Sequence, residues 1–273
     1  MIRAYKIAIL ATGAASVFAL LAGISFAAVD ASPPDAQRLN DLLERTAGQT
    51  SVFLDQFSDV KCTEQVRQEK LGRDNKVELK EESTYDYLVI LTNAGGELSL
   101  SESRIPVHEA KKDRKNTSML LSNGFATLFL VFHPIYADAF KFTLAEQEVI
   151  AGRTLQKVTF QHITGMKSPA ALALRGREYP LELAGTAWVD PQTGSIAKIE
   201  AGIADTLQDV GLKTLNSEID FSPLTFADSK QAYWFPTQAT VEVETVRQHW
   251  RNLHQFVGYK KFSVSTEEKV TQK

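Results

Sequence analysis

The side chains of this chain best suited to metal binding or nucleophilic catalysis are its five histidines and its single cysteine. The histidines are scattered, and the closest pair, His249 and His254, lies five positions apart. On a strand that spacing puts the two rings on opposite faces of a sheet. The sequence holds no His-Glu-x-x-His or other metal-ligand motif, so we predict no metal site.

Cys62 has no cluster of histidine or arginine beside it in sequence that would lower the pKa of its thiol. We therefore predict a buried or half-buried strand residue and not a reactive thiol. As the only cysteine it forms no intramolecular disulfide, so apolar packing must hold the core together.

Motifs of the common enzyme classes are also missing from the sequence. There is no Gly-x-Ser-x-Gly elbow, no phosphate-binding Gly-x-x-x-x-Gly-Lys-Ser/Thr loop and no Gly-x-Gly-x-x-Gly turn. Carboxylate pairs such as Glu242 and Glu244 fall on one face of a strand beside basic neighbours, which is typical of a solvated sheet face. We predict a non-enzymatic protein without catalytic residues or cofactor. A hydrolase whose site assembles only in the folded chain is the alternative.

The N-terminal segment has the pattern of an export signal. Arg3 and Lys6 precede an uncharged stretch over residues 7–26, and Ser25-Phe26-Ala27 suits a cleavage site. We predict a signal peptide over residues 1–27, with an uncleaved membrane anchor as the alternative. Both place the following residues outside the cytoplasm, in the periplasm or secreted, and membrane attachment is expected only through an uncleaved segment.

The charge balance bears on the class of partner. The chain has 30 Lys and Arg against 33 Asp and Glu, a net charge of −3. Nucleic-acid-binding domains present a concentrated basic face, so we expect no nucleic-acid partner. The length is ample for a single β-rich domain over residues 32–273.

Residues 32–57 predict an amphipathic helix. Ser32-Pro33-Pro34-Asp35 suits a helix start, and apolar residues recur at helical spacing from Leu39 to Phe57, with a weak point at Gly48. We expect this helix to lie on a sheet. A helix bound to a membrane surface is the alternative, although the polar face lacks the enrichment in Lys and Arg that such helices use.

Most of the remaining chain predicts antiparallel β structure. The runs Lys61–Leu71 and Val77–Thr92 form a hairpin whose charged residues are expected on a solvated face. A second β series covers residues 140–162, and residues 165–184 are predicted to be a long connection. A meander with one buried face follows the turn at residues 190–194. Its later strands are expected at residues 196–204, 212–221, 239–246 and 256–264.

Met119–Phe132 differs from the rest of the chain because it is apolar on nearly all sides and stops at His133-Pro134. It is too short to cross a membrane, so it predicts a buried helix that contacts apolar surface on more than one side. The helix is either an ordinary part of the core or a plug or lid inside a concave sheet.

The aromatic residues concentrate in the C-terminal third of the chain. An aromatic-lined hollow would bind acyl chains or apolar peptides, and the same residues would equally form an ordinary sheet core. The sequence leaves both interpretations open. The residues concerned are Trp188, Trp234, Trp250, Tyr233, Phe235 and Tyr259.

One hairpin carries a resemblance to a known family. Residues 185–196 read Gly-Thr-Ala-Trp-Val-Asp-Pro-Gln-Thr-Gly-Ser-Ile, and Lys198-Ile199-Glu200 and Tyr233-Trp234-Phe235-Pro236 follow. This pattern resembles the LolA/LolB-like lipoprotein-carrier superfamily, in which a Trp-x-Asp-Pro-x-Thr-Gly hairpin joins adjacent strands. The resemblance implies an α+β, mostly antiparallel β fold. Its curved open-barrel sheet would have an N-terminal helix and a buried central helix on the concave side.

The resemblance also implies that the concave side accepts acyl chains and that residues 119–132 form the covering helix. We therefore expect an extracytoplasmic binding protein for an apolar ligand, a lipid or a lipoprotein acyl chain, held by burial of apolar surface. A protein-interaction or sensor module of the same fold, with an envelope protein as partner, is the alternative. The residues expected to contact the ligand are Leu120, Phe125, Phe129, Phe132, Trp188 and Trp234.

Overall fold

The computed structural model describes residues 33–94, 97–108, 125–174, 177–227 and 232–261, so the predicted signal segment lies outside the described residues. Within these ranges no helix combines the length and the apolar composition that a membrane-spanning helix needs. The helices used below are α1 (Pro33–Ser58) and the 3-10 helix η2 (Phe125–Phe132). The strands are β1 (Val60–Leu71), β2 (Val77–Ala94), β3 (Glu97–Pro106), β4 (Phe140–Ile150), β5 (Arg153–His162), β6 (Ala171–Leu174), β7 (Arg177–Pro180), β8 (Leu183–Val189), β9 (Ile196–Ile203), β10 (Leu212–Thr225), β11 (Ala232–Thr245) and β12 (His249–Lys261).

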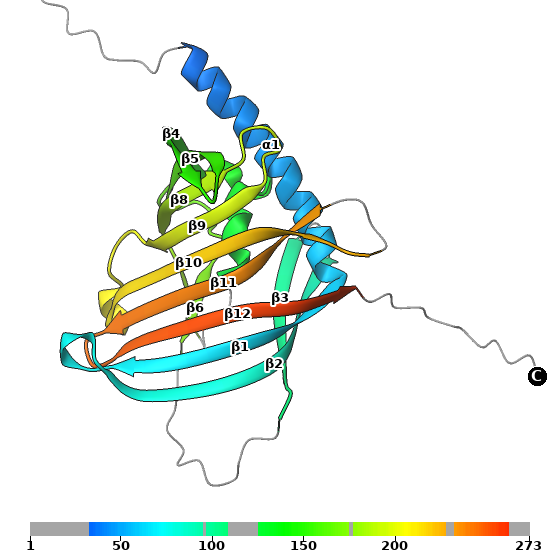
Figure 1. The fold of residues 1–273 in the computed structure, drawn as a ribbon. Coiled ribbons are helices and arrows are strands. Elements are labelled where there is room, and N and C mark those ends of the chain that lie inside the picture. The colour runs from blue at the N-terminus through cyan, green and yellow to red at the C-terminus, as the bar shows by residue number, and fades with distance from the viewer. Residues whose placement is uncertain (1–32, 95–96, 109–124, 175–176, 228–231, 262–273) are drawn as a thin grey trace, which may run out of the picture. The chain divides into compact units, whose positions relative to one another are not determined.

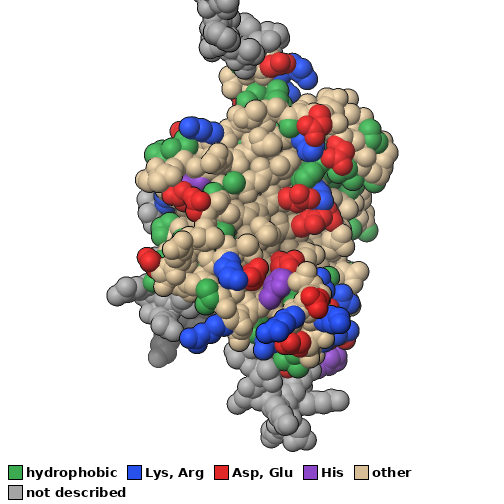
Figure 2. All heavy atoms as spheres, turned by 90° about the vertical axis from the view of Figure 1, so that its left-hand side faces the viewer, with side chains coloured by type: hydrophobic (Ala, Val, Ile, Leu, Met, Phe, Trp, Pro, Cys, Tyr) green, Lys and Arg blue, Asp and Glu red, His purple; other side chains and the backbone are tan. Residues whose placement is uncertain are grey.

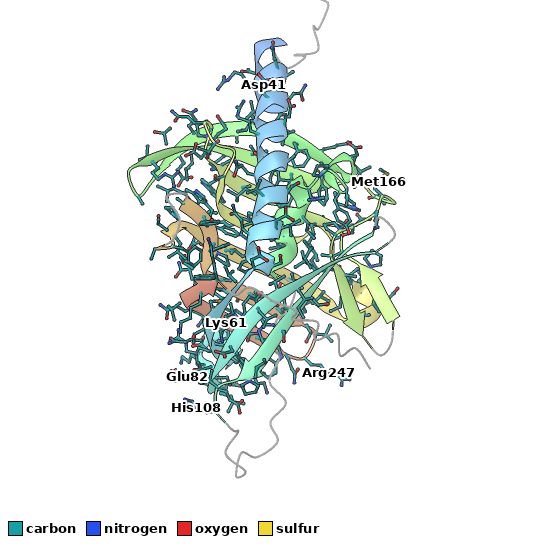
Figure 3. The ribbon with its side chains drawn as sticks, turned by 90° about the vertical axis from the view of Figure 1, so that its right-hand side faces the viewer. Asp41, Lys61, Glu82, His108, Met166 and Arg247 are labelled. Carbon is teal, nitrogen blue, oxygen red and sulfur yellow. The ribbon has the colours of Figure 1, made fainter. Side chains whose placement is uncertain are left out.

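Ten of these strands form one antiparallel sheet in the order β3-β2-β1-β12-β11-β10-β9-β8-β5-β4. The last strand, β12, pairs with the first, β1, and brings Val66 opposite His254. The edge strands are β3 and β4, so the sheet is open. Figure 1 shows the strands stacked in this order, and Figure 3 shows the sheet curving behind α1. The predicted curved, open antiparallel sheet is confirmed.

Side-chain alternation decides which face of the sheet is buried. Along β1, Val60, Cys62 and Val66 are buried, and Lys61 and Gln65 between them are exposed. Successive side chains on a strand point to opposite faces, so one face carries the core and the other meets solvent. We call these the inner and outer faces. The prediction that Cys62 is a buried strand residue is confirmed.

Helix α1 lies across the inner face, as Figure 3 shows. Its buried residues, Leu42, Thr46, Thr50, Leu54 and Phe57, recur every three or four positions and form one stripe. That spacing keeps them on one side of a helix with 3.6 residues per turn. The predicted helix on the sheet is confirmed, and the helix continues without a break through the glycine at position 48.

The buried helix predicted over residues 119–132 is described from residue 125, where η2 begins. It is a 3-10 helix and contacts α1, β9 and β11, so it is covered on several sides. Leu128, Phe129, Leu130, Val131 and Phe132 are all buried. Seven of its eight residues are apolar, and a 3-10 helix of this length is uncommon. Residues 119–124 lie outside the described residues.

The connection predicted at residues 165–184 contains a small hairpin of its own. Strands β6 and β7 pair antiparallel, with Ala171 opposite Pro180. The Leu181 amide donates to the Ala170 carbonyl at 2.9 Å and closes the base of the hairpin. Leu172 and Leu181 pack against the core, so this segment covers apolar surface as its composition predicts.

Candidate functional site

A continuous series of aromatic rings joins α1 and η2, which we call together the cover, to the inner face of the sheet. The rings of Phe129 and Phe53 lie 4.4 Å apart, centroid to centroid, and Phe53 and Phe57 are 5.0 Å apart. From Phe57 the series continues to Phe235 at 5.5 Å and then to Tyr259 at 5.0 Å. Such ring pairs add stabilisation beyond their buried area. The interior is therefore an apolar, aromatic surface with the cover seated on it.

A small pocket, which we call the rim pocket, opens where α1, η2 and the sheet meet. It has a volume of about 40 Å³, far below the roughly 300–1,000 Å³ of a typical ligand site. In this conformation the cover occupies the space that the sequence interpretation reserved for a ligand. The residues that line it are Gln49, Thr50, Phe53, Gln56, Phe129, Gly194, Ser195, Ile196, Phe221, Ala232 and Trp234.

The hairpin between β8 and β9 forms one wall of the rim pocket. Asp190 Oδ1 accepts hydrogen bonds from the backbone amides of Gln192 and Thr193 at 2.9 and 3.0 Å and shapes the turn. Gly194 adopts a φ of +76°, and a Cβ placed on it would lie 2.6 Å from the carbonyl carbon of Arg45 in α1. A glycine is required both by the backbone angle and by the close approach of the helix. The motif residues therefore seat α1 as well as making a turn.

Trp234 stands at the rim pocket under a cation. The Arg153 guanidinium lies 4.3 Å from the centre of its ring and pairs with Asp190 at 2.6 Å. Burial opposes ionisation of Asp190, but the turn amides and Arg153 outweigh it and lower the pKa of that carboxyl. The ion pair and the ring thus hold the hairpin against β11 and fix the pocket wall.

Two of the six residues predicted to contact ligand meet in the rim pocket, namely Phe129 and Trp234. Phe132 lies elsewhere on the inner face, with ring centroids 5.2 Å from Phe142 and 5.9 Å from Phe160. Leu120 lies outside the described residues, and Phe125 is the first residue of η2, with no side-chain position described.

Trp188 lies on the outer face and does not line the rim pocket. Its neighbours Ala187 and Val189 belong to the core, so alternation turns the indole the other way. Lys157 and Lys198 lie 5.6 and 5.0 Å from its ring centre, and its Nε1 donates to Glu148 at 2.9 Å. Lys198 also pairs with Glu200 at 2.7 Å and with Glu218 at 2.6 Å. Figure 2 shows acidic and basic side chains interspersed over one side of the molecule.

Sequence reasoning missed the contribution of α1 and of β10 to the pocket. Phe53 and Phe57 are four positions apart in the helical apolar pattern, which marked them as buried without indicating their ring partners. Phe221 comes from β10 and lies 6.0 Å from Phe53. The helical spacing was the available signal for Phe53, and only the strand order brings Phe221 to the same place.

The inner face also holds a charged cluster, and one member, Glu64, belongs to the hairpin whose charged residues were predicted on a solvated face. Glu64 is fully buried. Its Oε1 accepts a hydrogen bond from Arg104 Nη2 at 2.9 Å and lies 2.8 Å from His254 Nδ1. Glu102 pairs with Arg104 at 2.9 Å. Burial opposes ionisation of Glu64, but hydrogen bonds with His254 and Arg104 lower its pKa below the usual value. The expectation of a solvated face is wrong here because these side chains share the inner face with the core.

The Cys62 thiol is unsuited to act as a nucleophile. Burial raises the pKa of the Cys62 thiol to about 12, although a hydrogen bond from Tyr259 works in the opposite direction. A thiol with that pKa stays protonated near neutral pH and is a poor nucleophile. Among the described residues no group of three or more His, Cys, Asp or Glu is placed to hold a metal ion.

Comparisons with known proteins give distant structural neighbours, including the two described below. No family model matches the chain, and no curated protein matches its sequence. A DUF1329 family protein from Desulfovibrio piger ATCC 29098 is 9% identical with a TM-score of 0.44, and the match covers 86% of this chain and 99% of that one. A "putative outer membrane lipoprotein-sorting protein domain" from Vibrio parahaemolyticus is 10% identical with a TM-score of 0.40, covering 86% and 94%.

The second neighbour is described as a lipoprotein-sorting domain, the class of protein that the hairpin motif resembles. The likeness is one of fold and is distant. The function proposed below therefore rests on the geometry of this chain.

Proposed function

We propose that this protein is an extracytoplasmic, non-enzymatic binding protein for an apolar ligand, such as a lipid or a lipoprotein acyl chain. The observation that carries the proposal is the aromatic inner face beneath a cover whose central piece, η2, is apolar in seven of its eight residues. A ligand enters at the rim pocket, displaces η2 and takes its place on the aromatic surface. The export pattern at the N-terminus supports the location outside the cytoplasm.

The exchange of cover for ligand is balanced in energy. Fully burying a large apolar side chain contributes about 1.5–3 kcal/mol, so the buried side chains of η2 contribute about 8–15 kcal/mol in total. A buried methylene contributes about 0.8 kcal/mol, so an acyl chain of about sixteen methylenes contributes about 13 kcal/mol. A long chain therefore matches what it displaces, and a chain half as long does not.

The anchoring of η2 supports its role as the movable piece. A 3-10 helix has poorer hydrogen-bond geometry than an α-helix, so less is lost when it detaches. The segment after it is joined to η2 by the His133 amide, which donates to the Leu130 carbonyl at 2.9 Å, and the Ile135 amide donates to His133 Nδ1 at 3.3 Å. Neither edge of the sheet has to separate for η2 to move, because η2 pairs with no strand.

The test is chain-length dependence together with exposure of η2. We expect delipidated protein to bind oleoyl glycerol and not octanoyl glycerol in native mass spectrometry. Binding should speed hydrogen–deuterium exchange of the η2 amides and leave unchanged the amides of β1, a strand that contributes no residue to the rim pocket. Binding that is independent of chain length, or that leaves η2 exchange unchanged, would contradict the proposal. A co-purifying polypeptide in place of a lipid would favour the protein-interaction alternative.

A further inference from the structure

The rim pocket contains a buried hydroxyl that makes no hydrogen bond. Thr50 is only 3% exposed, and its Oγ1 has no partner among the described residues. Two other hydroxyls on α1 are satisfied within the helix, since Thr46 donates to the Leu42 carbonyl at 2.8 Å and Ser51 donates to the Ala47 carbonyl. A buried polar atom without a partner is costly. Thr50 is therefore an exception on its own helix, and it lines the pocket.

A second hydroxyl faces the same pocket from the hairpin. Ser195 is buried and lines the pocket, and its Oγ accepts from the Thr193 hydroxyl at 3.0 Å. A serine hydroxyl both accepts and donates, so its own hydrogen remains for another partner. Gln49 and Gln56 add amide groups to the lining. The pocket thus combines polar side chains with the rings of Phe53, Phe129, Phe221 and Trp234.

The absence of charged side chains in the described lining distinguishes neutral amphiphiles from ionised ones as ligands. None of the described residues that line it is charged, and the nearby Arg153 is already paired with Asp190. An ionised carboxylate or phosphate placed here would lack a counter-charge, which is unfavourable in a buried site. Ester carbonyls and alcohols need only hydrogen bonds, and the two hydroxyls supply them.

Resting on the binding function proposed above, we infer that the rim pocket holds the uncharged polar end of an acyl ester or long-chain alcohol. Thr50 and Ser195 hydrogen-bond that end, and the acyl chain lies on the aromatic inner face. The protein thereby selects uncharged acyl lipids over ionised fatty acids. The pocket volume of about 40 Å³ suits a small polar group and is too small for the chain itself.

The test compares three probes that each carry a large apolar part and differ in their polar end. Diphenylhexatriene is a hydrocarbon, oleoyl glycerol carries an ester and hydroxyls, and oleate at pH 8 is ionised. We expect oleoyl glycerol to displace diphenylhexatriene at a concentration about tenfold lower than oleate does. A tenfold difference in affinity is about the contribution of one hydrogen bond between neutral groups. Equal displacement by oleate would overturn the inference and leave the binding function standing. Failure of all three probes to bind would instead overturn the proposed function.

A variant pair assigns the effect to one atom. Thr50→Val removes the hydroxyl at nearly constant volume, and Thr46→Val does the same at a buried site on the same helix that does not line the pocket. We expect Thr50→Val to weaken oleoyl glycerol binding by about three- to tenfold and to leave diphenylhexatriene binding unchanged. Thr50→Ser should restore binding of oleoyl glycerol. If Thr50→Val and Thr46→Val behave alike toward oleoyl glycerol, the inference fails.

Discussion

Replacing Gly194 by alanine tests whether the β8–β9 hairpin seats helix α1. Gly194 has a φ of +76°, and its Cα approaches the helix so closely that an added Cβ would lie 2.6 Å from the Arg45 carbonyl carbon and 2.8 Å from the Thr46 amide nitrogen. Carbon atoms in contact are normally about 3.5–4.0 Å apart. The helix backbone must therefore move by about 1 Å to accommodate the methyl group.

Gly152 provides a matched control for the backbone angle. It has a φ of +77°, and nothing lies within 4 Å of an added Cβ. Alanine in the left-handed region costs about 1–2 kcal/mol, and we expect Gly152→Ala to lose only that amount. Overpacking adds about 1–3 kcal/mol, so Gly194→Ala should lose about 2–5 kcal/mol.

Urea unfolding followed by tryptophan fluorescence measures both losses. We expect the midpoint of Gly194→Ala to fall clearly below that of Gly152→Ala, with similar slopes. In Gly194→Ala the amides of α1 around Arg45 should also exchange faster, because the helix is lifted from the hairpin. Equal stability losses in the two variants would refute the close contact between the hairpin and α1.

Further predictions concern the buried charges. Arg104→Met leaves the Glu64 carboxylate buried without its cation and should lower the free energy of unfolding in urea by about 3–5 kcal/mol. Arg38→Met removes an exposed ion pair and should lower it by less than about 1 kcal/mol. Comparable losses in the two variants would contradict the burial of the cluster. Burial lowers the pKa of His133, so its contribution to stability is present above the ordinary pKa of about 6.5 and is lost as pH falls through the lowered value. His133→Gln should therefore flatten the fall in the urea midpoint just below pH 6.5, and an unchanged profile would count against this. Because the pKa of Cys62 is about 12, the native thiol should resist a disulfide reagent at pH 8 and react fully in urea, whereas fast native labelling would contradict its burial.

Element types were predictable from the sequence, and element ends were less so. The helix at α1 and the hairpin of β1 and β2 lie where the patterns predict them. Strand β11 begins at Ala232, seven residues before the predicted start, because Tyr233 pairs with Leu224 of β10. Strand β12 begins earlier than predicted for the same reason, since its first residues pair with β1. The length of a strand depends on its partner, which a local pattern does not contain.

The candidate site shows the same division. Phe129 and Trp234 were predicted to contact the ligand, and both line the rim pocket. The sequence could not show that Trp188 faces outward, because the face of a strand is decided by the core that forms around it. Nor could it show that Thr50 has no partner, because that depends on the packing of α1 against the hairpin.

By itself the sequence determined the periodic features of this protein, because the periods of 2 and 3.6 and the geometry of the Asp-Pro-x-Thr-Gly turn are local properties of the chain. Only the tertiary structure decided which surfaces meet. Glu64 and His254 are 190 residues apart and come within hydrogen-bond distance because β12 pairs with β1. The aromatic interior is likewise non-local. Strand order and helix placement bring together rings from η2, α1, β10, β11 and β12.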